Sequence, residues 1–171
     1  MFSGITGIIH FSTSILALVA GSIILIKVKG TSNHKVIGYV YTVAMLVLLV
    51  TSFMLYNLNG NFNLFHGFAV VSSVSLLGGM LPMIIKKPAN YLALHFSFMY
   101  WSVIGLYCAL AAEVFTRLPY FIDFEENVVK IFYILVGVAT ALVGGIGSFY
   151  FRKLKKKWQN LENRFRKKTE S

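Results

Sequence analysis

Apolar residues fill five long runs of the chain, and polar residues gather in the stretches between them. A helix needs about 20 apolar residues to cross the hydrocarbon core of a membrane. Five segments reach that length: Gly4–Ile26, Val36–Leu55, Leu64–Ile85, Tyr91–Ala112 and Val128–Phe151. A span in lipid must satisfy its backbone hydrogen bonds internally, which a single strand does not do. The pattern therefore predicts an all-α integral membrane protein with five transmembrane helices, a four-helix bundle plus a peripheral fifth helix.

Composition supports the same class of protein. Of the 171 residues, 57% are hydrophobic and 13% are charged, whereas soluble domains carry about 25% charged residues. The net charge of +10 does not indicate nucleic-acid binding, because nine of the 16 basic residues follow Phe151 and most others lie in two short loops. Charge placed in this way sets the topology of a membrane protein and attracts anionic lipid head groups.

The basic residues also predict the orientation. They gather in the first loop, in the third loop and at the start of the tail, at Lys27, Lys29, Lys35, Lys86, Lys87 and the segment 152–157. In a five-helix topology these three regions fall on one side of the membrane, and loops rich in lysine and arginine stay in the cytoplasm. We therefore expect a multi-pass protein of the cell (inner) membrane, with the N-terminus outside and the C-terminus inside.

The residues after the fifth span form a second region. Residues 1–151 are expected to make the transmembrane domain, and residues 152–171 a basic amphipathic cytoplasmic tail. Apolar side chains recur there at alternating steps of three and four, at Phe151, Leu154, Trp158, Leu161 and Phe165. An apolar stripe on a cationic helix is typical of a helix that lies on a membrane surface. We expect the tail to contact the bilayer and its anionic head groups, in preference to a specific partner helix.

The fifth span carries small residues on one helical face, at Gly137, Ala141, Gly144 and Ser148. Small side chains at this spacing let helices approach closely in lipid. We expect this face to pack the fifth helix onto the bundle.

The candidate functional residues are four histidines, one in each of the first four spans or at its edge. In the predicted topology His10 and His66 lie toward the outside, and His34 and His95 toward the inside. Helices one and three are diagonal neighbours in an up-down bundle, as are two and four, and a haem iron takes axial ligands from opposite faces of its ring. The pattern favours haem b at two bis-histidine sites, His10 with His66 and His34 with His95. The sites would lie roughly 25–30 Å apart, so that electrons could cross the membrane.

Other roles for the histidines stay open. His34 and His66 are near the interface, where a histidine can cap a helix, whereas intramembrane ionisable residues such as His10 and His95 are usually functional. Imidazole also suits copper and zinc, although the two layers would need separate two-histidine sites. The alternatives are a metal or small-solute transporter, or an assembly factor with structural histidines. The chain has no zinc-protease motif and no apparent Ser/His/Asp set, so the question of an enzyme is left open and restricted to a membrane oxidoreductase or electron carrier.

The run from Lys29 to Tyr41 reads K-G-T-x-x-H-K-x-x-G-x-x-Y. It resembles a family of small bacterial membrane proteins catalogued as a domain of unknown function, over about residues 5–120. The family has further histidines that match His10, His66 and His95. The resemblance implies a multi-pass bacterial membrane protein and carries no established chemistry.

The layout of single histidines is architecturally similar to the four-helix core of the ascorbate-reducible transmembrane di-haem cytochromes b. In that group diagonal helices ligate one haem near each membrane surface, which implies two haem sites here as well. The chain departs from the group in its five helices, its shorter histidine spacings and the lack of a matching substrate motif. The resemblance therefore implies neither an electron donor nor an acceptor.

Overall fold

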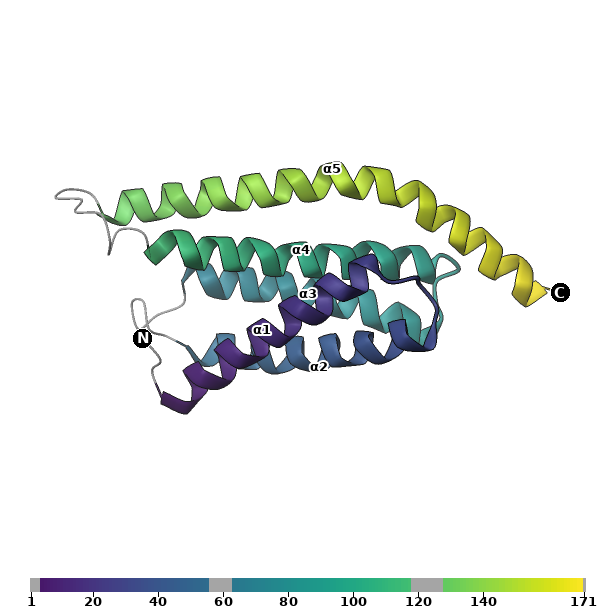
Figure 1. The fold of residues 1–171 in the computed structure, drawn as a ribbon, viewed down its shortest axis with the longest axis horizontal. Helices are drawn as coiled ribbons and strands as arrows, with labels where there is room; N and C mark the ends of the chain where they lie inside the picture. The colour runs from purple at the N-terminus through teal and green to yellow at the C-terminus, as the bar shows by residue number, and fades with distance from the viewer. Residues whose placement is uncertain (1–3, 56–62, 118–127, 171) are drawn as a thin grey trace. The chain divides into compact units, whose positions relative to one another are not determined.

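The computed structural model describes residues 4–55, 63–117 and 128–170, and five helices account for most of them (Figure 1). They are α1 (Gly4–Ile26), α2 (Ser32–Met54), α3 (Leu64–Ile85), α4 (Tyr91–Arg117) and α5 (Val128–Glu170). Each helix has a stretch long and apolar enough to cross a membrane, and the described residues contain no strand. The prediction of an all-α protein with five spanning helices is confirmed. The chain divides into two compact units, Met1–Leu77 and Gly78–Ser171, with the boundary inside α3.

The second helix begins earlier than the apolar pattern predicts, at Ser32 instead of Val36. Thr31 is the N-cap, and its side-chain oxygen accepts a hydrogen bond from the backbone N–H of His34 at 3.2 Å. A capped first turn tolerates polar residues, because what it needs is acceptors for its free N–H groups. His34 therefore lies inside the first turn of α2 and not ahead of the helix.

The fourth and fifth helices both run past the ends of their apolar runs. The fourth continues from Ala112 to Arg117, and the fifth continues from Phe151 to Glu170 without a break (Figure 1). The 43 residues of α5 span about 64 Å, roughly twice the thickness of the hydrocarbon core. Lysine, arginine, glutamine and leucine all favour helix, so the change from apolar to basic residues does not end the helix. The predicted tail is the continuation of α5.

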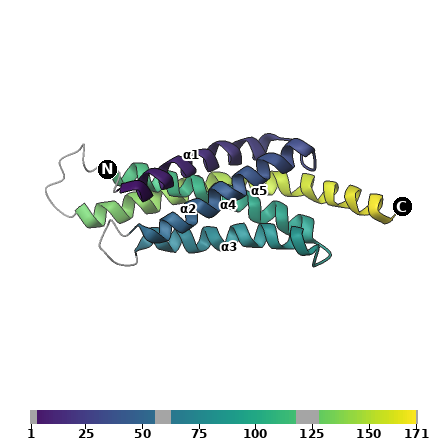
Figure 2. The ribbon, with the colours of Figure 1, turned by 90° about the horizontal axis from the view of Figure 1, so that it is seen from below.

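In the first unit, α1 packs along α2 (Figure 2). The short loop between them makes the two helices antiparallel neighbours, and the contact of His10 with Thr51 sets their register. Ala17 and Ala20 of α1 and Tyr41 of α2 are all buried. Small side chains such as these alanines let helices approach closely, which is ordinary packing for helices in lipid.

In the second unit, α4 packs along α5 in the antiparallel direction. The hydroxyl of Tyr100 donates a hydrogen bond to the carbonyl oxygen of Gly147 at 2.7 Å. Further from the start of α4, the thiol of Cys108 donates to the carbonyl oxygen of Thr140 at 3.9 Å. Residues near the start of α4 therefore meet residues far along α5.

The face of α5 that packs is not the small-residue face predicted from the sequence. Gly137 and Ala141 are exposed, whereas Val136 and Ala139 are buried. A larger apolar side chain gains more van der Waals contact on burial than a glycine does. The close approach to α4 is made at Gly147, outside the predicted set.

The Gly147→Ala substitution is expected to destabilise the pairing of α4 with α5. A Cβ atom at this position would lie 2.7 Å from Cγ2 of Ile104, and overpacking of this kind costs about 1–3 kcal/mol. Gly144→Ala is the matched control, because a Cβ atom there meets nothing within 4 Å and alanine favours helix by about 1 kcal/mol over glycine. Thermal unfolding in detergent measures both variants, and equal midpoints would contradict the packing.

Candidate functional site

The four histidines lie at distinct places in the two units. His10, His34 and His66 belong to the first unit and His95 to the second. Along α2, His34 is in the first turn, and Thr51, which contacts His10, is near the last. The separation of His34 and Thr51 along the helix corresponds to roughly 26 Å at 1.5 Å per residue. His10 and His34 are therefore at opposite ends of the pair formed by α1 and α2.

His10 is half-buried and reaches across to α2. Its Nδ1 atom lies 3.1 Å from the hydroxyl oxygen of Thr51. The hydroxyl of Thr51 donates to carbonyl oxygens of its own helix, those of Val47 and Leu48, each at 2.9 Å. Its oxygen is left to accept a hydrogen bond, so the Nδ1–H group of His10 is the donor. In a neutral imidazole this arrangement puts the ring lone pair on Nε2.

His95 makes the equivalent contact in the second unit. Its Nδ1 atom lies 2.9 Å from the carbonyl oxygen of Gly79 on α3. A carbonyl oxygen only accepts hydrogen bonds, so Nδ1–H of His95 donates and the lone pair is again on Nε2. Gly79 permits the close approach of the helices, since a Cβ atom there would lie 2.7 Å from Sδ of Met99 on α4. A second helix therefore holds the ring in one tautomer.

His66 is buried in the first turn of α3. Asn63 caps this helix: its side-chain oxygen accepts from the N–H of Phe65 at 3.0 Å, and its own N–H lies 3.2 Å from Nδ1 of His66. This is the arrangement of a capping box, with histidine where glutamate or glutamine is usual. The same Nδ1 atom is 3.1 Å from the side-chain oxygen of Asn63. Accepting from the N–H leaves the ring proton on Nε2, and donating to the oxygen requires it on Nδ1, so the two contacts select different tautomers.

The structure brings His10 and His66 to the same end of the first unit. Both contact the last turns of α2, His10 through the threonine hydroxyl and His66 through the ring of Phe53, with centroids 6.4 Å apart. His34 and His95 belong to different units. Within the described ranges of each unit, no group of three or more His, Cys, Asp or Glu side chains converges.

Sequence reasoning does not find the residues that hold the histidines. Thr51 gives the clearest signal available, a hydroxyl within an apolar run. Asn63 caps α3, and its contact with His66 gives it a second role. Gly79 takes part through its backbone carbonyl alone, so the residue type gives no signal of this contact.

Lys29, predicted as a topology charge, caps α1. Its ammonium group donates to the carbonyl oxygens of Ile24 and Leu25 at the end of the helix, where a cation also interacts favourably with the helix dipole. Burial lowers the pKa of Lys29 to about 8. Lys29 is therefore a structural residue of the first loop, whereas Lys27 and Lys35 are exposed charges.

A protein-family model matches most of the chain. It is described as Predicted membrane protein (DUF2306) and covers residues 7–151, leaving out the basic extension of α5. No curated protein and no solved structure matches the chain. The expectation of a multi-pass membrane family is confirmed, and neither the K-G-T motif nor the likeness to cytochromes b is tested by the match. The chain belongs to the DUF2306 family of predicted membrane proteins.

Proposed function

We propose that this membrane protein binds haem b and carries electrons within or across the membrane. The candidate axial ligands are the pairs His10 with His66 and His34 with His95. One observation supports the proposal most directly: Nδ1–H of His10 and Nδ1–H of His95 each donate to an acceptor on a neighbouring helix. Histidines that ligate a metal commonly donate their other N–H in this way, which fixes the ring and its tautomer.

A haem held by two histidines supplies reversible one-electron transfer when it is bound. The residues of the chain would prepare its ligands. The hydroxyl of Thr51 orients the ring of His10, the carbonyl oxygen of Gly79 orients that of His95, and each hydrogen bond raises the basicity of Nε2.

His66 fits the proposal in one of its two tautomers. When Nδ1 donates to the side-chain oxygen of Asn63, Nε2 carries the lone pair and suits a metal ion. His66 also shares one end of the first unit with His10, as an outer ligand pair requires. In the inner pair, the supporting contact is the hydrogen bond from His95 to Gly79. His34, its proposed partner, lies in the first turn of α2.

The capping geometry of Asn63 and His66 favours a second candidate function. If Nδ1 accepts the N–H of Asn63, His66 is a structural residue that begins α3, with its ring proton on Nε2. The chain would then be a non-redox membrane protein, a metal or small-solute transporter or an assembly factor, whose histidines join helices. In that case copper or zinc, or no cofactor, would replace haem.

An absorption spectrum separates the two functions. The protein is purified in detergent from haem-replete cells and its spectrum is recorded before and after dithionite reduction. We expect a Soret band that shifts on reduction, and a pyridine haemochrome assay should approach two haems per chain. A preparation without a Soret band would contradict the haem proposal, and stoichiometric copper or zinc in the same sample would favour the transporter.

A further inference from the structure

The extension of α5 beyond Phe151 is attached to α4. Trp158 is buried, and its ring centroid lies 6.0 Å from that of Phe96 and 5.6 Å from that of Tyr100, both on α4. Phe151 also packs on Tyr100, with centroids 5.5 Å apart. The first turns of the extension therefore continue along the start of α4.

This attachment changes the role of the apolar stripe. The sequence predicts that the stripe lies on the membrane surface, but its members Phe151 and Trp158 are covered by α4. A helix whose apolar face already has a partner gains little by lying flat in the interface. The side chain of Phe165 is outside the described residues. The extension follows the apolar span without a break in the helix, and α5 bends toward its C-terminal end (Figure 1).

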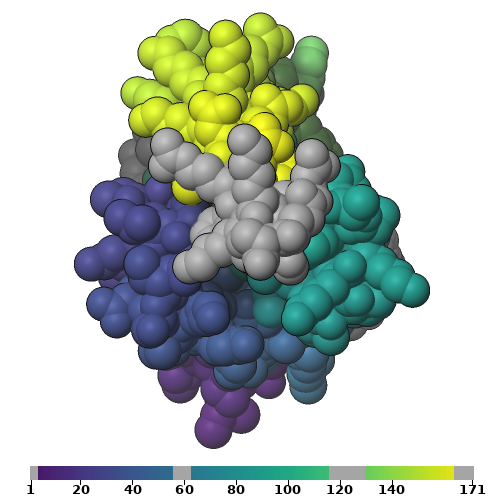
Figure 3. Space-filling view, turned by 90° about the vertical axis from the view of Figure 1, so that its right-hand side faces the viewer, coloured from purple at the N-terminus to yellow at the C-terminus, as the bar shows by residue number. Residues whose placement is uncertain are grey.

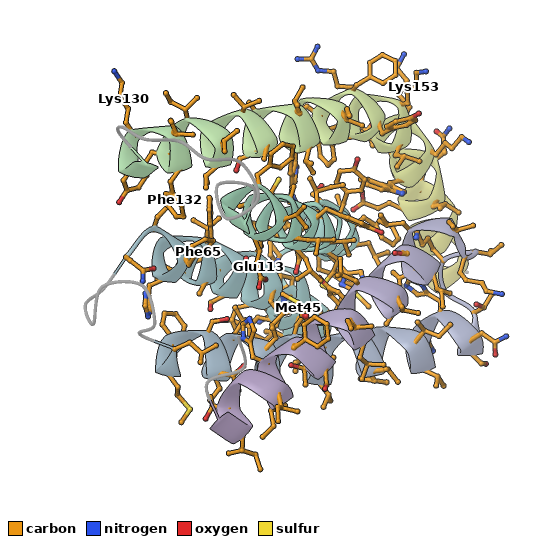
Figure 4. All side chains as sticks on the ribbon, turned by 60° about the vertical axis from the view of Figure 1, so that its left-hand side comes forward. Met45, Phe65, Glu113, Lys130, Phe132 and Lys153 are labelled. Atoms are coloured by element: carbon orange, nitrogen blue, oxygen red, sulfur yellow. The ribbon has the colours of Figure 1, made fainter. Side chains whose placement is uncertain are left out.

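The basic residues occupy the opposite face of the same turns. Their side chains are all exposed: Arg152, Lys153, Lys155, Lys156 and Lys157. At 100° per residue they cover an arc of about 200° on the side away from Trp158, and they rise over about 7.5 Å of helix. The polar layer on each side of a bilayer is about 5–7 Å thick, so these residues span it. Figure 4 shows Lys153 on the outer side of α5, away from α4.

The neighbours of these five basic residues indicate that they lie at the edge of the apolar span. The ammonium of Lys153 lies 4.4 Å from the ring centroid of Phe149. The ring of Phe149 contacts that of Tyr150, and the ring of Phe151 contacts that of Trp101 on α4. Aromatic side chains gather in this way at the boundary between membrane and water. Figure 3 views the molecule from this end, and the atoms of α5 are the yellow-green and yellow ones at the top.

We propose that Arg152, Lys153, Lys155, Lys156 and Lys157 form a basic collar that binds anionic phospholipid head groups where α5 leaves the membrane. Charge complementarity carries the assignment, because no acidic residue occurs between Lys130 and Glu162. Each basic residue near an anionic surface contributes on the order of 1 kcal/mol. The collar and Trp158 together would hold the extension against α4 at the membrane surface, and neither depends on whether the protein binds haem.

The test titrates the full-length protein in a neutral detergent with short-chain phosphatidylglycerol, with the matching phosphatidylcholine and with inorganic phosphate. The tail variant removes four charges of the collar: Lys153→Gln, Lys155→Gln, Lys156→Gln and Lys157→Gln. The matched control removes four exposed charges near the two other basic turns of the chain: Lys27→Gln, Lys35→Gln, Lys86→Gln and Lys87→Gln. We expect phosphatidylglycerol to bind more tightly than phosphatidylcholine or phosphate, and the tail variant to lose about tenfold or more of that affinity.

The control variant should keep an affinity within about threefold of the unmodified protein, because its charges are outside the collar. Equal loss in the two variants would overturn the proposal and indicate attraction by total charge. Equal binding of phosphate or phosphatidylcholine would overturn it as well. Should the tail variant fail to fold, the unmodified protein decides the matter: at 1 M salt, where the Debye length is about 3 Å, phosphatidylglycerol binding should fall to the phosphatidylcholine level.

Discussion

His10→Ala and His95→Ala are each expected to remove about half of the haem bound per chain and to leave the other half. The two residues belong to opposite levels in the proposed pairing, and His10 lies roughly 26 Å along α2 from His34, its counterpart at the other level. Effects at sites so far apart are usually independent. Pyridine haemochrome assays on both variants and on the double variant measure the result. Loss of all haem from either single variant would contradict two sites, and no loss from either would contradict the assignment of ligands.

A change at Thr51 tests the hydrogen bond that supports the haem proposal. Thr51→Val keeps the shape of the side chain and removes the acceptor of the Nδ1–H of His10. The ring then becomes less basic, so the oxidised form of a bound haem is stabilised less and the midpoint potential should rise. Thr42→Val is the control on the same helix, because that hydroxyl donates to Gly38 of its own helix.

The same pair of variants separates a purely structural histidine from a ligand. A structural contact predicts a loss of about 0.5–1.5 kcal/mol for Thr51→Val, because the half-buried Nδ1–H of His10 loses its acceptor, and no change in any potential. Redox titration and thermal unfolding of the two variants distinguish these outcomes.

The spans were predictable because lipid imposes a simple rule of length and apolarity. The ends of the helices followed other physics. The first turn of α2 consists of four polar or basic residues before Val36, so the apolar pattern does not show where the helix begins. The cap at Thr31 stabilises this turn. Beyond Phe151 the composition becomes basic but keeps a high helix propensity, so the end of an apolar run does not mark the end of α5.

The partners of the histidines were not predictable for a related reason. A helix that is apolar all round shows no preferred face, so the sequence does not reveal that His10 meets Thr51 or that His95 meets the backbone of Gly79. The layering of His10 and His34 could be predicted, because it depends only on chain direction and helix length. The pairing of His34 with His95 stays a prediction.

Trp158→Ala is expected to cause the largest loss of stability among the substitutions considered. The side chain is 7% exposed and packs on three aromatic rings, including Phe151 at 5.7 Å, and truncation of such a residue costs about 3–5 kcal/mol. The extension should also detach from α4, so that trypsin cleaves more rapidly between Lys153 and Lys157, because cleavage requires local opening of the helix. Limited proteolysis and thermal unfolding in detergent measure both effects.

Two further variants show whether burial of Trp158 is the cause. Tyr150→Ala removes an aromatic ring that is 54% exposed and should change stability by less than about 0.5 kcal/mol. Trp158→Phe keeps an aromatic ring against Phe96 and Tyr100 and should recover most of the protection from trypsin. If Trp158→Ala is cleaved no faster than the unmodified protein, the ring does not hold the extension. The basic collar would then have to bind lipid on a helix free to lie on the leaflet, as the apolar stripe alone predicts.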